Sequence, residues 1–175
     1  MNWASAFSLP SEHLLKKGAL LTTLSVLDEE WRVSFEIKPT SYNYNGFAQI
    51  LHMTIGGKIA NVGDRTPALW IHKTKGVYLA TSLNGKPNIG KFFKTKKPSL
   101  NQWTTVEMSQ TKQGSKHIFS FSIGGETLWS VENTKPRKFY SVKVFASSGW
   151  YLAQAGSIRQ FKIENVLPGG KKIQP

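Results

Sequence analysis

The sequence predicts an all-β protein, an antiparallel two-sheet sandwich or jelly roll of about ten or more short strands. Three observations lead to this prediction: apolar and polar residues alternate along short segments, helix signals are almost absent, and turn-forming residues separate the segments. A chain of 175 residues can bury a core without a disulfide or a metal. We therefore expect one domain over residues 1–175.

The clearest strand is WRVSFEIKP, residues 31–39, in which every second residue is apolar and Pro39 ends the pattern. Further strands are expected at residues 19–26, 47–54, 68–73, 76–82, 103–110, 117–123, 126–132, 140–146 and 157–164. The one helix signal is SEHLLKKGALL, where Ser11 as a cap and Gly18 as a stop allow at most a single short turn.

Turn-forming residues lie between these segments. Asn84-Gly85 predicts a tight turn, and Gly124-Gly125 predicts a hairpin between HIFSFSI and ETLWSVE. The Pro-Gly-Gly near the end predicts a turn, and we expect the tail over residues 167–175 to be flexible.

The composition excludes several classes of protein. The chain has no cysteine, which removes thiol catalysis, cysteine–zinc sites and disulfides. No run of about 18 apolar residues is present, so we expect no transmembrane segment. The opening MNWASAFSLPSEHLL lacks the basic start and long apolar core of a signal peptide, and we expect none in this chain.

The charge is strongly positive, with 23 Lys and Arg against 10 Asp and Glu. Such a field attracts anionic partners, which include nucleic acid, sulfated or sialylated glycans and acidic lipid surfaces. Basic residues surround Phe92-Phe93 in GKPNIGKFFKTKKP and recur in KPRK, and we take as a candidate basic patch Lys91, Lys94, Lys96, Lys97, Lys135, Arg137 and Lys138. The alternative is a solvated lysine-rich loop. No nucleic-acid-binding motif is present, which argues against that partner.

A resemblance to a known family rests on the segments KKGALLTTLSVLDEEWRVSFEIKPTSY, ILHMTIGGKIANVGDRTPALWIH, LNQWTTVEMSQ, NTKPRKFYSVKVFASSGWY and GSIRQFKIENV. Together they resemble laminin-G-like domains of the concanavalin A-like lectin/glucanase superfamily, as found in extracellular multidomain animal proteins. The resemblance covers about residues 17–166. It implies a jelly roll whose C-terminal strand, SIRQFKIENV, lies beside the N-terminal one, and an extracellular or secreted location. The ligand is left open, because this superfamily contains lectins, adhesion modules, glycanases and toxins.

The acidic residues do not form a catalytic pair. Glucanases of this superfamily carry carboxylates that alternate along one strand, so that two of them share a face. Here the acids cluster only as Asp28-Glu29-Glu30, where neighbouring side chains diverge, and no G-x-S-x-G sequence is present. We therefore predict that the protein is not an enzyme and that it has no catalytic residue.

No metal site is expected either. Calcium sites use several oxygen ligands, and some laminin-G-like domains carry one, but Asp64 is the only acid in a mid-chain loop. His52 and His72 lack a third ligand for zinc. We predict no cofactor, with calcium as the one ion that the resemblance would allow.

The loop NVGDRTP admits two interpretations. Arg65 would suit a carboxylate or sulfate through its planar guanidinium. Alternatively, Asp64 accepts backbone N–H groups in a turn while Arg65 pairs locally. Gly63, Asp64 and Pro67 are all turn-forming residues, and the resemblance places the loop among the regular features of the fold. Both favour the structural interpretation.

One sheet face is a candidate binding surface. If Leu51, Met53, Leu69, Ile71, Val77 and Leu79 point into the core, the opposite face carries His52, Thr54, Trp70, His72, Tyr78 and Ser82. Flat aromatic rings beside polar groups suit a sugar, which has an apolar face and a polar edge. The alternative is that aromatic pairs only stabilise the sheet. Two expected loops add candidate ligand-binding residues: Tyr42, Asn43, Tyr44, Trp150 and Tyr151.

These observations predict a non-catalytic recognition module for carbohydrate, preferably an anionic, sialylated or sulfated glycan or a glycoprotein that carries one. A protein-binding adhesion module of the matrix or cell surface is the alternative, and a glycan-processing enzyme is the third hypothesis. Binding lost at high salt would favour the anionic glycan over the adhesion module.

Overall fold

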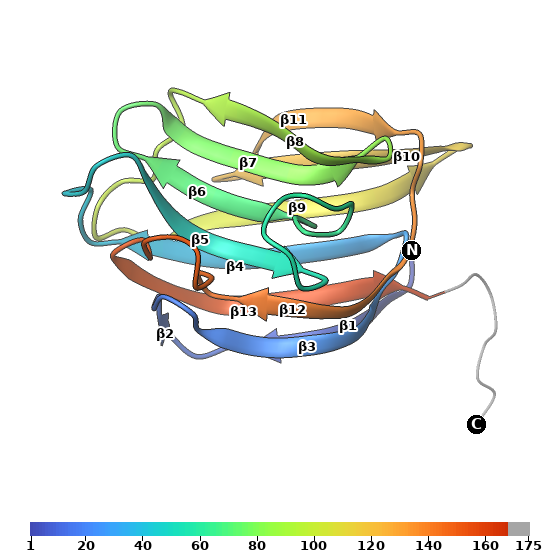
Figure 1. The fold of residues 1–175 in the computed structure, drawn as a ribbon, viewed down its shortest axis with the longest axis horizontal. Helices are drawn as coiled ribbons and strands as arrows, with labels where there is room; N and C mark the ends of the chain where they lie inside the picture. The colour runs from blue at the N-terminus through green and yellow to red at the C-terminus, as the bar shows by residue number, and fades with distance from the viewer. Residues whose placement is uncertain (168–175) are drawn as a thin grey trace.

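The computed structural model describes residues 1–167, which fold into two antiparallel β-sheets that face each other across the core (Figure 1). The seven-stranded sheet has the order β1 (Trp3–Leu9), β13 (Gly156–Val166), β4 (Trp31–Pro39), β9 (Thr104–Gln113), β10 (Lys116–Ile123) and β11 (Glu126–Asn133), with β2 (His13–Leu14) paired to β13. The six-stranded sheet has the order β3 (Leu20–Leu27), β12 (Phe139–Phe145), β5 (Phe47–Thr54), β6 (Ala68–His72), β7 (Gly76–Leu83) and β8 (Lys86–Phe93). The predicted all-β sandwich is confirmed.

The alternating pattern works as predicted. Along β4, every apolar residue of WRVSFEIKP is buried and every polar one is partly exposed. Leu51, Met53, Leu69 and Ile71 point into the core from the six-stranded sheet, as do Val77 and Leu79 of β7. The large side chains Phe119, Phe121 and Phe161 meet them from the seven-stranded sheet.

The predicted turns are present where the structure describes them. Asn84 (φ 55) and Gly85 (φ 74) join β7 to β8, and Gly124 (φ 59) and Gly125 (φ 82) join β10 to β11. Two positive φ angles in succession match the right-handed twist of a hairpin, which is why Asn-Gly and Gly-Gly suit these positions. The Pro-Gly-Gly turn lies outside the described residues, as does the predicted flexible tail apart from Leu167.

Three segments differ from the sequence-based expectation. Residues 11–18 contain no helical turn, because Leu14 and His13 pair with Ser157 and Ile158 of β13 instead. Strand β1 was not predicted, since WASAFSL has small and polar residues and lies at a sheet edge, where burial imposes little alternation. Strand β8 forms an edge of the six-stranded sheet. The first part of the lysine-rich segment GKPNIGKFFKTKKP, which could have been a solvated loop, is therefore a strand.

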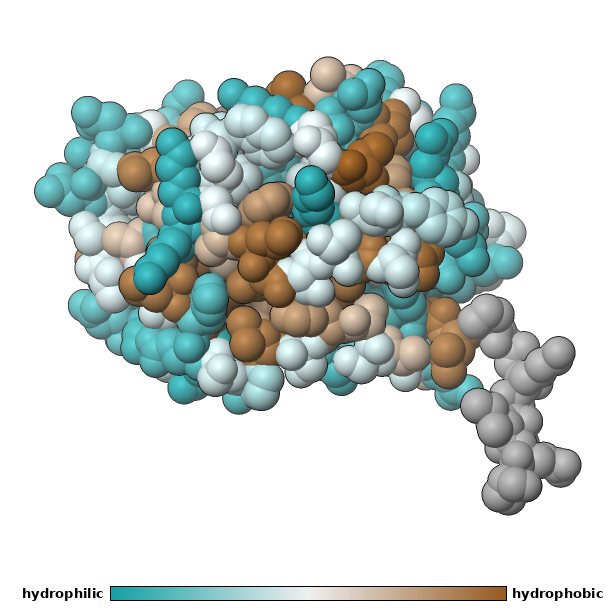
Figure 2. Space-filling view, turned by 60° about the horizontal axis from the view of Figure 1, so that its bottom comes forward, coloured by the Kyte–Doolittle hydropathy of each residue, from teal (hydrophilic) through white to brown (hydrophobic). Residues whose placement is uncertain are grey.

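The termini and the surface complete the fold. β1 pairs with β13, so the C-terminal strand lies beside the N-terminal one, as the resemblance implied. No helix within residues 1–167 is long and apolar enough to cross a membrane. Figure 2 shows that apolar side chains on the side of the molecule that includes the β3 edge are separated by polar ones. This view therefore shows no single broad apolar face.

Candidate functional site

The outer face of the six-stranded sheet carries a continuous layer of aromatic rings, which we call the aromatic strip: Phe47, Trp70, Tyr78 and Phe92. Trp70 of β6 lies directly opposite Tyr78 of β7, and Tyr78 lies opposite Phe92 of β8. Ring centroids are 5.6 Å apart for Trp70–Tyr78, 4.7 Å for Tyr78–Phe92 and 5.8 Å for Phe47–Phe92. Strand register therefore brings Trp70, Tyr78 and Phe92 together, and Phe47 of β5 joins them through ring contacts with Tyr78 and Phe92.

Tyr78 packs closely against Gly90, where a side chain would not fit. Gly90 of β8 is placed so that a Cβ atom there would come within 2.0 Å of the Tyr78 hydroxyl oxygen. Any other residue at position 90 would push the ring off the sheet, so the glycine serves close packing here.

An open pocket of about 280 Å³ lies on the strip. The strip residues line it together with Ile59, Arg65, Asn88 and Tyr151. These side chains come from β5 to β8 and from two loops, residues 55–67 and 146–155, that border the sheet face. The lining combines flat apolar surface with one cation, one amide and one phenol hydroxyl.

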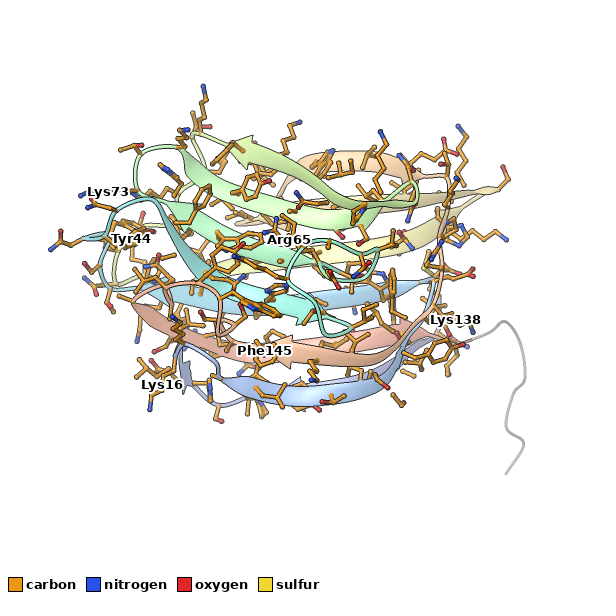
Figure 3. The ribbon with its side chains drawn as sticks, viewed as in Figure 1. Lys16, Tyr44, Arg65, Lys73, Lys138 and Phe145 are labelled. Carbon is orange, nitrogen blue, oxygen red and sulfur yellow. The ribbon has the colours of Figure 1, made fainter. Side chains whose placement is uncertain are left out.

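Arg65 is the only charged residue among the described ones that lines the pocket, and Figure 3 shows it over the middle of the six-stranded sheet. Nη1 donates a hydrogen bond to Asn88 Oδ1 at 2.6 Å, and Nη2 donates to the Tyr151 hydroxyl at 2.7 Å. The guanidinium carbon lies 4.6 Å from the Trp70 ring centroid. The side chain is thus fixed in three directions by neutral groups.

The Arg65 charge is buried, and no acid among the described residues pairs with it. The residue is only 5% exposed, and within residues 1–167 it forms no ion pair. Its Nε–H group and the indole N–H of Trp70 are buried with no hydrogen-bond acceptor among the described residues. Buried cations are normally paired with a carboxylate, so this arrangement is costly for the protein alone.

The loop that presents Arg65 is held on both sides. Asp64 accepts a hydrogen bond from the Asn61 backbone N–H at 2.8 Å, which agrees with its predicted turn role. The Arg65 carbonyl accepts from the Ser82 N–H at 2.7 Å, and the Thr66 N–H donates to the Met53 carbonyl at 2.9 Å. The structural interpretation also expected Arg65 to pair with a nearby residue. This part is wrong, because its side-chain partners are Asn88 and Tyr151.

A buried histidine supports the same loop. His52 Nε2 lies 2.7 Å from the Asp64 carbonyl oxygen, which fixes this nitrogen as the N–H donor. Its Nδ1 then accepts from Ser148 Oγ or Gln49 Nε2, at 3.2 Å and 3.3 Å. His52 is therefore a positioning residue beneath the pocket loop rather than a surface available to a ligand.

His52 is expected to make the stability depend on pH. Burial lowers its pKa from 6.5 to about 4, and the nearby Arg65 charge acts in the same direction. Between these values the unfolded chain binds more protons than the folded one. The free energy of unfolding should therefore be highest above about pH 6.5 and fall by up to about 3 kcal/mol as the pH drops toward 4.

Denaturant titrations of the wild type and of His52→Gln across this pH range measure the effect. The variant should lose clearly less stability on acidification, while His13→Gln, at a partly exposed position of the short strand β2, serves as the control. Equal acid sensitivity of wild type and His52→Gln would show that His52 is not the group responsible.

The tyrosines of the 40–46 loop are anchored by their hydroxyls. Tyr42 donates to the Pro98 carbonyl at 2.5 Å, and Tyr44 lies 2.9 Å from Gln154 Oε1. Burial raises the pKa of both hydroxyls, that of Tyr44 to about 12. Asn43 between them is exposed. The loop lies at the end of the sandwich, and neither it nor its residues line the pocket.

The remaining predicted residues lie around the pocket. His72 ends β6 with its ring 4.8 Å from Phe47, and its Nδ1 accepts backbone N–H bonds from Thr74 and Lys75. Trp150 is 42% exposed and lies 5.3 Å from the buried His52 ring. His72 borders the aromatic strip, and neither residue lines the pocket itself.

The seven cations of the predicted basic patch do not come together. Lys96 pairs with Glu126, and Lys97 donates to the Lys73 carbonyl at 2.8 Å. Lys138 pairs with Asp28 at 3.2 Å, and Figure 3 places it at the opposite end of the sandwich from Lys73. The KPRK segment precedes β12 at one end of the sandwich, whereas Lys97, which follows β8, lies at the Lys73 end, so the two basic segments form separate surfaces.

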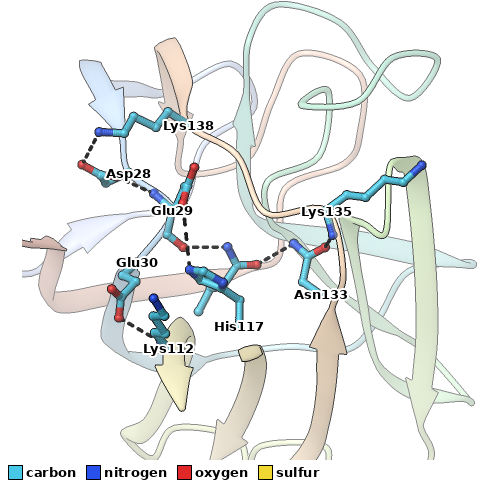
Figure 4. A network of polar contacts seen from close by, with 9 residues as sticks. Asp28, Glu29, Glu30, Lys112, His117, Asn133, Lys135 and Lys138 are labelled. Atoms are coloured by element: carbon cyan, nitrogen blue, oxygen red, sulfur yellow. Dashed lines mark hydrogen bonds and ion pairs between the residues drawn. The ribbon is translucent and has the colours of Figure 1, made fainter. Parts of the chain in front are cut away.

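The acidic cluster forms structural contacts, shown in Figure 4. Asp28 accepts from the Glu29 backbone N–H and from Lys138, while Glu30 accepts from the Lys112 backbone N–H at 2.8 Å. Gln110 Nε2 donates to the Glu29 carbonyl at 2.6 Å. Among residues 1–167, no three acidic or histidine side chains lie close enough to hold a metal ion.

Four pocket residues were missed as site residues by sequence reasoning: Phe47, Ile59, Asn88 and Phe92. Counting every second residue back from Leu51 would put Phe47 in the core. A register shift between Gln49 and Leu51 moves it to the outer face. Asn88 and Phe92 lie on the unpredicted edge strand β8. Ile59 carried no signal, since an isolated apolar loop residue is common.

Comparison with known proteins shows the fold. No protein-family model and no curated protein sequence matches the chain. Among solved structures, it is similar to the Ruminococcus gnavus IT-sialidase CBM40 bound to α2,6-sialyllactose, with a TM-score of 0.58 and 17% identity over 95% of this chain and 96% of that one. The fold is a jelly-roll sandwich.

Other solved jelly rolls are similar over nearly the whole chain. A leech intramolecular trans-sialidase matches with a TM-score of 0.55 and 15% identity, over 93% of this chain and 27% of that one. The receptor-binding domain of botulinum neurotoxin type G matches with a TM-score of 0.53 and 11% identity, over 95% of this chain and 43% of that one. At these identities the jelly roll is shared, and the site must be argued from this chain's own residues.

Proposed function

We propose that this jelly roll is a non-catalytic carbohydrate-binding module that takes the acidic end of a sialylated, or otherwise carboxylate-bearing, glycan in the Arg65 pocket. The observation that carries the proposal is the buried Arg65 guanidinium, which within residues 1–167 has two neutral partners and no carboxylate. A ligand carboxylate would supply the missing negative charge. Charge-assisted hydrogen bonds of this kind are strong in a partly dehydrated pocket.

The rest of the pocket suits a sugar ring. The strip offers flat aromatic faces, and Asn88 and Tyr151 offer polar atoms beside them. Because Asn88 and Tyr151 also hold Arg65 in place, the guanidinium is preorganised, and little side-chain entropy is lost on binding. The structural similarity to a module bound to sialyllactose supports the same substrate class.

The absence of an acid from the pocket supports a binding role. Glycoside hydrolysis normally uses two carboxylates that flank the scissile bond. None of the residues that line the pocket, all within the described chain, is Asp or Glu. Asp64 is next to Arg65 in sequence, but its carboxylate accepts from the Asn61 backbone.

The resemblance to laminin-G-like domains adds a finer proposal about context. We infer that the module acts outside the cell, where sialylated and sulfated glycans are displayed. The net charge of +13 would draw such anionic surfaces toward it over long range.

A glycan panel tests the proposed function. Lactose, sialyllactose and sulfated lactose would be presented to the wild type at low and at physiological salt. We expect binding of sialyllactose that survives physiological salt, together with no binding of lactose. Binding to every anionic glycan that disappears at physiological salt would show that the net charge alone causes the binding, without a specific site. A partner protein bound without regard to salt or glycan would favour the adhesion module.

A further inference from the structure

Three lysines form a second cationic feature at one end of the strip, which we call the lysine rim: Lys73, Lys75 and Lys97. Lys73 and Lys75 belong to the turn between β6 and β7, and Lys97 follows β8. The Lys97 ammonium reaches this turn, where it donates to the Lys73 carbonyl at 2.8 Å. Figure 3 shows Lys73 at the end of the sandwich, beside the loop of Tyr44.

Contacts hold the Lys97 ammonium and the backbone of Lys73 in place. The Lys97 ammonium lies 3.8 Å from the Tyr42 ring centroid, and the Tyr42 hydroxyl is itself bound to the Pro98 carbonyl. The Lys73 backbone N–H donates to the Gly46 carbonyl at 2.9 Å. Cations ordered by such contacts lose less entropy when an anion arrives than free surface lysines do.

In the described part of the chain, these lysines have no acidic partner. Within residues 1–167 none of the three lysines forms an ion pair, whereas Lys38, Lys96, Lys116, Lys138 and Lys162 do. Partial burial and the Lys73 charge lower the pKa of Lys97, and the pKa of His72 is lowered by burial and by Lys75 and Lys97. The end of the sheet is thus a concentrated positive site.

The lysine rim is continuous with the pocket. The Lys75 ammonium lies 5.5 Å from the ring centroid of Phe92, and Phe92 lines the pocket. The Arg65 guanidinium carbon lies 4.6 Å from the Trp70 ring centroid. The ring centroids are then 5.6 Å apart for Trp70 and Tyr78, and 4.7 Å apart for Tyr78 and Phe92. A chain of sugars that starts at Arg65 and lies along the aromatic strip would therefore end among the lysines.

We propose that the site takes an oligosaccharide with two anionic groups, one held by Arg65 in the pocket and the second by Lys73, Lys75 and Lys97 at the lysine rim. The inference rests on the proposed function and narrows it to a doubly charged ligand, such as a disialylated or a sialylated and sulfated chain. Because the lysine rim is exposed to solvent, its contribution should be modest and sensitive to salt.

Two ligands and two variants test this inference by calorimetric titration. The ligands are 3′-sialyllactose, with one charge, and disialyllactose, with two. The first variant, Lys73→Gln/Lys75→Gln/Lys97→Gln, removes the lysine rim. The matched control, Lys112→Gln/Lys116→Gln/Lys135→Gln, removes the same charge at the other end of the sandwich, where Asn84 of the β7–β8 turn bonds to Asn133.

The wild type should bind disialyllactose about fivefold more tightly than 3′-sialyllactose at low salt. The lysine rim variant should lose this preference and keep its affinity for 3′-sialyllactose, and the control should behave as wild type. Equal affinity of the wild type for both ligands, or equal losses in the two variants, would overturn the inference alone. Failure of the wild type to bind either ligand would overturn the proposed function as well.

Discussion

Replacement of Arg65 by lysine is expected to weaken binding of 3′-sialyllactose by about tenfold to hundredfold, although the charge is unchanged. Lysine cannot reproduce the paired donors that hold Asn88 and Tyr151, nor the planar contact with Trp70. The carboxylate would then meet a mobile ammonium in place of a fixed fork. Calorimetric titration of wild type and variant gives the ratio directly.

The matched control for this variant is Arg137→Lys. Arg137 is exposed and does not line the pocket, so its replacement should leave the affinity unchanged. The thermal midpoint of Arg65→Lys must also be measured, because Arg65 is buried. Undiminished binding by a folded Arg65→Lys would show that the guanidinium does not hold the ligand. The loop that carries Arg65 would then have only a structural role.

Replacement of Trp70 by alanine is expected to lower the free energy of unfolding by about 3–5 kcal/mol. Trp70 is 1% exposed and packs against Tyr78, Tyr151 and the Arg65 guanidinium, so its removal would leave a cavity beneath the pocket. This differs from the picture of an exposed stacking platform, since Trp70 forms the floor of the site. Denaturant unfolding of the variant measures the loss.

Trp150→Ala is the control for the size of the side chain. Trp150 is 42% exposed, and we expect its removal to cost less than about 1 kcal/mol. If Trp70→Ala were no more destabilising than Trp150→Ala, Trp70 would not be the packed floor that the structure describes, and stacking on the ligand would become its main role.

Much of the fold was predictable, because burial on one face imposes a period of two. That rule gave the orientation of Leu51, Leu69 and Leu79 toward the core, and hence placed Trp70 and Tyr78 together on the opposite face. The period-of-two pattern did not identify the edge strands. Neither face of β1 or β8 is fully covered, so their sequences carry little alternation.

The site was predictable only in part. Trp70 and Tyr78 are neighbours by strand register, which a sequence pattern can indicate. The partners of Arg65 are 23 and 86 residues away in the chain, and only the folded chain brings Asn88 and Tyr151 to it. The turn-forming residues around Asp64 favoured a structural role for the whole loop, and they carry no information about where the Arg65 side chain points.

The central claim is that Arg65 receives the acidic group of a glycan, and the Arg65 Nε–H resonance tests it most directly. The buried Nε–H has no acceptor within the described residues, and Arg65→Lys would identify its signal by loss. We predict that 3′-sialyllactose shifts this resonance in a saturable way while lactose leaves it unchanged. Saturable binding of 3′-sialyllactose that leaves the Arg65 resonance unmoved would contradict the account and place the ligand elsewhere on the molecule.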